Sequence, residues 1–148
     1  MDLRSLMAAA LALAALLPAR VLAADYADIL GKWRVVQVRT VASLHGVQAL
    51  ADDDPLYMGA GIDFQLGGIV WLPKPQQQFE TDACRARPSL KPQLPDTRKP
   101  QDGYAVDGGY DVYCGRKKWG PAVILPVDGQ TLVLYWFDNA VLTLKQQG

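Results

Sequence analysis

The sequence has few of the side chains on which most enzymes and transition-metal sites depend. Its 148 residues include one histidine, His45, one glutamate, Glu80, and two cysteines. Catalytic proton transfer relies mainly on histidine and carboxylates, and transition-metal sites need several nitrogen or sulfur ligands. No serine-centred glycine motif accompanies His45 and the nearby Ser43, so we interpret His45 as an ordinary loop residue. We therefore predict that the protein is not an enzyme and has neither a cofactor nor a metal ion.

An excess of positive charge is also absent. The 15 lysines and arginines are matched by 15 aspartates and glutamates, and 13 basic against 14 acidic residues remain without residues 1–23. Strong nucleic-acid binding needs a basic surface. A basic run at residues 116–118 precedes Trp119, and we interpret it as a polar, exposed turn and not as a phosphate contact. The sequence predicts no nucleic-acid partner.

No apolar run is long enough to cross a membrane. Arg4 is followed by an apolar stretch of about 12 residues, and a small-residue site ends at Ala23. A membrane-spanning helix needs roughly 20 apolar residues, whereas this order of charge, apolar run and small residues is typical of a secretory signal peptide. We predict that residues 1–23 are a signal peptide and that residues 24–148 form one periplasmic or secreted domain that does not span the membrane.

Two cysteines in an exported chain predict one disulfide, between Cys84 and Cys114. On the chain-entropy account, closing a loop of this length stabilises a fold by roughly 3 to 4 kcal/mol. A redox-active pair would need a C-x-x-C spacing or a nearby histidine to lower a thiol pKa. The sequence has neither, so we interpret the disulfide as structural.

Beyond residue 23, short runs of valine, isoleucine, leucine, tyrosine and tryptophan alternate with glycine, proline and aspartate, which predicts strands throughout. The first is expected at 33–41, with Trp33 and Val35 on one face and Val36 and Val38 on the other. Gly67-Gly68 and residues 107–109 are expected to be the turns of two hairpins. The predicted strands are 33–41, 62–66, 69–72, 104–106, 110–114, 122–127, 131–137 and 140–145.

About eight strands in sequential hairpins predict an all-β, antiparallel up-and-down barrel, because closure removes the exposed sheet edges. Residues 42–57 read as an irregular loop. Residues 73–102 hold six of the ten prolines, and proline weakens a strand by removing a ladder hydrogen bond. We expect most of this segment to be a long loop.

Gly31-Lys32-Trp33, at the start of the first predicted strand, resembles the G-x-W signature of the lipocalins. The resemblance implies an eight-stranded, lipocalin-like barrel in which Trp33 closes the bottom and packs on a basic side chain of the last strand, here Lys145. It also implies that the loop after the first strand partly covers the barrel mouth. The family's T-D-Y motif is not matched, because Ala83 follows Thr81-Asp82.

Four large rings on predicted strands are the candidate ligand-binding residues: Trp71, Tyr104, Tyr110 and Tyr135. Aromatic rings that point into a barrel either fill it or line a ligand cavity. The sequence leaves these two alternatives open.

The acidic run at residues 52–54 offers oxygen atoms that suit calcium. Three consecutive aspartates project in different directions, however, and no glycine is placed for a wrapped calcium loop. With Pro55 following, we interpret the run as turn or capping chemistry.

Two functions fit these features. The first is an exported lipocalin-like binding protein for a small apolar ligand in the barrel mouth. The second is a protein-binding inhibitor or immunity-type protein, directed at a cell-wall hydrolase or another exported enzyme. The second rests on residues 73–102, because a segment anchored at Cys84 loses little entropy when it docks.

Overall fold

The computed structural model describes residues 24–41, 50–74, 83–94 and 103–148. The predicted signal peptide, His45 and Glu80 lie outside these residues. No helix in the described part is long and apolar enough to cross a membrane. Its elements are the 3-10 helices η1 (Tyr26–Ile29) and η4 (Phe137–Asn139) and the strands β1 (Gly31–Thr40), β2 (Gly61–Gln65), β3 (Gly68–Leu72), β4 (Pro88–Pro92), β5 (Tyr110–Cys114), β6 (Lys117–Asp128), β7 (Thr131–Tyr135) and β8 (Ala140–Gln146).

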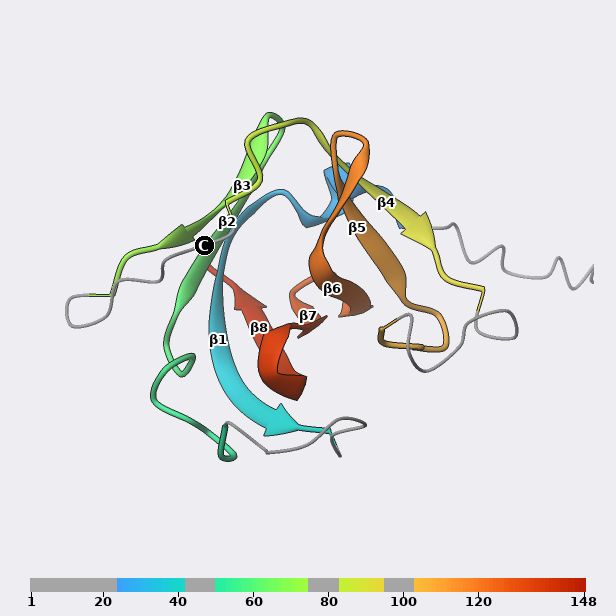
Figure 1. The fold of residues 1–148 in the computed structure, drawn as a ribbon. Helices are drawn as coiled ribbons and strands as arrows, with labels where there is room; N and C mark the ends of the chain where they lie inside the picture. The colour runs from blue at the N-terminus through green and yellow to red at the C-terminus, as the bar shows by residue number, and fades with distance from the viewer. Residues whose placement is uncertain (1–23, 42–49, 75–82, 95–102) are drawn as a thin grey trace, which may run out of the picture.

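The eight strands form one antiparallel sheet in the order β3-β2-β1-β8-β7-β6-β5-β4. The first strand therefore pairs with both the second and the last, and the sheet curls into a nearly closed barrel (Figure 1). At the seam between β3 and β4 an isolated bridge joins Ile69 to Cys84. The predicted all-β, eight-stranded up-and-down barrel is confirmed.

The predicted strand at 104–106 was wrong, because β4 takes its place as the partner of β5. β4 lies in the proline-rich segment that the sequence analysis assigned to a loop. Its prolines, Pro88 and Pro92, are its end residues, and β4 lies at an end of the strand order. Proline is tolerated at strand ends and sheet edges, where its missing N–H breaks no ladder.

Two further local predictions need correction. The turn between β2 and β3 is Leu66-Gly67, one residue earlier than predicted, since Gln65 pairs with Gly68. β6 begins at Lys117 and buries Trp119, so the basic run is not simply an exposed turn.

β1 contains a β-bulge that reverses the predicted face of Val38. The pairing of β1 with β8 shifts register between Val35 and Gln37. Val36 is the extra residue and is 43% exposed, whereas Val35 and Val38 are both buried. A bulge inserts one residue into a strand and so changes which later side chains face the core. Simple alternation could not reveal this.

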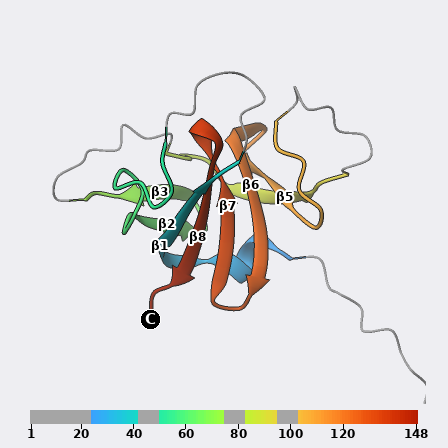
Figure 2. The same cartoon turned by 90° about the horizontal axis from the view of Figure 1, so that it is seen from below.

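The barrel is closed at one end by η1 and Trp33. The Trp33 side chain is buried, and its Nε1 donates a hydrogen bond to the Ile29 carbonyl at 2.8 Å. Gly31 links η1 to β1 with a φ of +114°, a conformation that suits glycine because it has no Cβ. Figure 2 shows η1 near the C-terminus and the β6–β7 turn, with the β7–β8 connection at the opposite end. η1 and Trp33 thus close this end of the barrel, and Gly31 provides the turn between them.

Lys145 does not lie beneath Trp33 as the lipocalin resemblance implied. The register of β1 and β8 sets Trp33 opposite Gln146 and Arg34 opposite Lys145. Residues directly opposite on neighbouring strands share a face, so Lys145 lies on the outer face with Arg34. Its amine donates a hydrogen bond to the Thr131 hydroxyl.

The predicted disulfide between Cys84 and Cys114 is present, with Cα atoms 5.5 Å apart. Cys84 is bridged to Ile69 on β3, and Cys114 ends β5. The covalent bond therefore links the two sides of the β3–β4 seam. It reinforces the barrel where the hydrogen-bond ladder is weakest.

Replacing both cysteines, Cys84→Ala with Cys114→Ala, should lower the free energy of unfolding by roughly 3 to 4 kcal/mol, because the unfolded chain regains the freedom of the closed loop. Urea unfolding of the double variant and the oxidised parent measures the difference. Equal unfolding free energies would show that the seam does not need the bond.

Trp33→Ala should lower the free energy of unfolding by roughly 3 to 5 kcal/mol, because it leaves a large cavity at the closed end. Val36→Ala on the same strand is the control, and its exposed side chain should contribute little. If the two variants melt at the same temperature, Trp33 does not anchor this end.

Candidate functional site

Four buried rings gather at the end of the barrel opposite η1; we call Tyr57, Trp71, Trp119 and Trp136 the aromatic cluster. The Trp136 ring centroid lies 5.6 Å from that of Trp71 and 4.5 Å from that of Trp119. Tyr57 packs against Trp71 at 6.0 Å. Each ring is less than a tenth exposed. The cluster therefore closes the end that would be the mouth of a lipocalin-like barrel.

The structure pairs two of the four predicted ligand-binding residues with each other. Trp71 belongs to the aromatic cluster, whereas the Tyr104 and Tyr135 rings pack against each other with their centroids 5.3 Å apart. The Tyr104 hydroxyl donates to the Trp136 carbonyl, and burial raises the pKa of Tyr104 to about 12, so it stays a protonated donor. Tyr110 lies apart, and its hydroxyl accepts a hydrogen bond from the Ala24 backbone N–H at 2.9 Å.

The described interior of the barrel is filled by side chains. Residues lining an open ligand cavity would remain accessible to a water-sized probe, since such cavities hold hundreds of cubic ångströms of free space. Trp33 and Phe64 are only 1% exposed. The core residues with no exposure at all are Val38, Ala60, Ile62, Ile69, Val112, Ile124, Leu134, Ala140, Leu142 and Leu144. Of the two alternatives for the aromatic rings, the structure favours filling.

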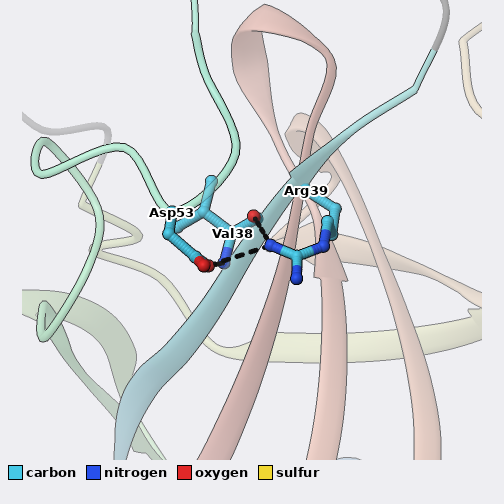
Figure 3. A network of polar contacts seen from close by, with 3 residues as sticks. All are labelled: Val38, Arg39 and Asp53. Carbon is cyan, nitrogen blue, oxygen red and sulfur yellow. Dashed lines mark hydrogen bonds and ion pairs between the residues drawn. The ribbon is translucent and has the colours of Figure 1, made fainter.

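The acidic run at residues 52–54 lies in a turn, as predicted. Its carboxylates attach the loop before β2 to the barrel. The Asp53 carboxylate accepts hydrogen bonds from the Val38 backbone N–H at 3.1 Å and from the Arg39 guanidinium at 3.0 Å (Figure 3). The Asp54 carboxylate accepts from the backbone N–H groups of Ala51 and Leu56. These bonds position the segment that places Tyr57 in the aromatic cluster. Within the described residues no group of three His, Cys, Asp or Glu is arranged to hold a metal ion.

A second feature lies on the outside of the barrel, where β1, β2 and β3 border a cleft of about 390 Å³. None of its described lining residues was predicted as a ligand contact, and the charged ones among them are Lys32, Arg34 and Lys74. The cleft joins segments far apart in the sequence, so no local motif marks it. Its lining residues are Lys32, Trp33, Arg34, Gly59, Gly61, Leu72, Pro73, Lys74 and Gln147.

The segment after Cys84 forms a third feature, the edge of the sheet at β4, which intramolecular bonds hold in place. In the described part of the chain β4 pairs with β5 alone. The buried Gln93 side chain donates to the Tyr104 carbonyl and to Asp111, and it accepts from the Val106 N–H at 2.7 Å. These bonds hold the end of β4 in place.

Comparison with known proteins identifies no relative of this chain. No protein-family model matches it, and neither a curated protein nor a solved structure matches. The likeness to lipocalins therefore rests on the sequence signature, and the barrel alone does not identify that family.

Acid should release the loop carrying Asp53. The Val38 backbone N–H, and after it Arg39, lowers the pKa of Asp53 in the folded protein. The stabilisation is therefore complete above the unfolded pKa of about 4 and is lost as the pH falls through the lowered folded value. An NMR titration should show the Val38 amide shifting only below about pH 4.

At neutral pH, Asp53→Ala should shift the Val38 amide resonance in the same way as acid shifts it in the parent protein. Asp52→Ala should leave this resonance unchanged. A Val38 resonance that is insensitive to both acid and Asp53→Ala would contradict this role for the carboxylate.

Proposed function

We propose that the chain is an exported, non-enzymatic binding protein that uses its barrel as a solid scaffold and binds a protein partner on its outer surface. The observation that carries this proposal is the filled interior, in which Val38, Ile62 and Leu144 have no exposed surface. A ligand in the barrel would have to displace packed side chains. A partner on the outer surface would displace no packed side chain.

The edge formed by β4 is the surface that best suits a protein partner. An extended segment of a partner can add to an exposed sheet edge through main-chain hydrogen bonds. The Cys84 disulfide and the Gln93 hydrogen bonds already order this edge, so little conformational entropy is lost on docking. Lys91 is exposed on β4, and Arg85 and Arg87 are exposed on the segment just before it, which favours a partner with acidic side chains beside its docking strand.

An inhibitor or immunity-type protein directed at an exported enzyme is the class that these features favour. Such proteins present a rigid surface to a partner and need no internal cavity. The predicted signal peptide and the disulfide are consistent with a partner in the same oxidising compartment.

A small apolar ligand is the second candidate. The aromatic cluster closes the mouth, and Phe137, whose ring packs on Trp136 at 5.1 Å, is 42% exposed. A ligand would enter only if η4 and these rings moved aside. This candidate therefore requires an opening of the cluster.

One set of measurements separates the two functions. The parent protein should show no saturable fluorescence increase with the neutral apolar probe N-phenyl-1-naphthylamine. Immobilised protein should retain a specific exported protein from cells of the source organism, to be identified by mass spectrometry and retested in purified form. Binding of that purified partner should weaken at least about tenfold in Arg87→Glu, because charge reversal opposes an acidic partner.

Arg34→Glu is the matched control, since Arg34 is an exposed arginine on β1 and not on the β4 edge. It should leave partner binding unchanged. Saturable binding of the probe, with loss of that binding in Trp136→Ala, would instead support the apolar-ligand function.

A further inference from the structure

Among the residues that the structure describes, the charged groups lining the outer cleft bordered by β1, β2 and β3 are all cations. Lys32 and Arg34 flank the buried Trp33 on β1, so both side chains point outward from the barrel. Lys74 enters from the chain beyond β3. No aspartate or glutamate among the described residues lines this cleft. We propose that the cleft binds a small organic anion with a carboxylate or phosphate group.

Two hydrogen bonds fix the position of the Lys74 ammonium group. Its Nζ donates hydrogen bonds to the backbone carbonyls of Pro55 and Met58, each at 2.7 Å. An ammonium group has three protons to donate, so one remains after these two bonds. The carbonyls fix the position of the amine without neutralising its charge.

The other two cations form no ion pair in the described structure. Neither Lys32 nor Arg34 takes part in the ion pairs of the described residues, which join Arg39 to Asp53 and Lys118 to Asp111.

The neighbours across the sheet affect the two cations differently. Asp63 is opposite Lys32 on β2 and offsets part of its charge, although Asp63 does not line the cleft and accepts a hydrogen bond from Gln65. Arg34 has Gly61 opposite on β2 and Lys145 opposite on β8. Like charges directly opposite on neighbouring strands are unfavourable, and an anion beside Arg34 would relieve this repulsion.

The shape of the cleft favours an organic anion over a simple ion. A Cβ added at Gly59 would meet no atom within 4 Å, whereas at Gly61, opposite Arg34, the Leu72 side chain already lies 2.9 Å from where a Cβ would be. Leu72 and Pro73 supply an apolar wall beside the cations. A planar guanidinium can pair with a carboxylate or phosphate through two parallel hydrogen bonds, while the hydrocarbon part of the ligand contacts the apolar wall.

This site is separate from the β4 edge and does not depend on the proposed protein partner. The test is an NMR titration of the oxidised protein at low ionic strength with phenyl phosphate, phenylacetate and inorganic phosphate. The two organic anions should shift the amides of Arg34 and Gly61 saturably, and added salt should weaken their binding. Inorganic phosphate should bind more weakly, because it makes no contact with the apolar wall.

Arg34→Gln should weaken binding of phenyl phosphate about tenfold, since it removes the bidentate donor. Arg116→Gln is the matched control, because it removes the same charge from an exposed arginine in the turn between β5 and β6, away from both proposed sites, and should leave the affinity unchanged. Equal weakening in the two variants would mean that only net charge matters and would overturn the site. Absence of saturable shifts would also overturn it, and inorganic phosphate binding as tightly as phenyl phosphate would overturn the proposed ligand class.

Discussion

The pairing of β1 with β8 is the constraint on which the rest of the structure depends. It joins the first strand to the last and turns a row of hairpins into a barrel. Because the sheet curls, the residues that face inward must share one enclosed volume. The bulge at Val36 turns Val38 into that volume, and the outward residues of β1, Lys32 and Arg34, are left on the surface.

The filling of the enclosed volume explains why the surface carries the candidate functions. An eight-stranded barrel is wide enough either for side chains to fill it or for one small ligand. Here Trp33 fills one end, and the aromatic cluster fills the other. Such a core makes a rigid scaffold, and rigid scaffolds support recognition by edges and outer clefts because little entropy is lost on binding.

Much of the architecture could be predicted from the sequence, because its signals are local. Alternating apolar residues marked β2, a continuous apolar run marked β3, and two cysteines behind a predicted signal peptide marked the disulfide. β4 was missed because its prolines argue against a strand unless its edge position is known. The outer cleft was missed because Lys32 and Lys74 are far apart in the sequence and meet only after β1, β2 and β3 pair.

The central claim is that the barrel interior is filled, and xenon tests it most directly. Xenon enters apolar cavities in proteins and is visible in crystals by its anomalous scattering. Crystals of the oxidised protein under xenon pressure should show no xenon among Trp33, Phe64 and Leu144 or within the aromatic cluster. An ordered xenon atom at either place would contradict the account and restore an internal apolar site.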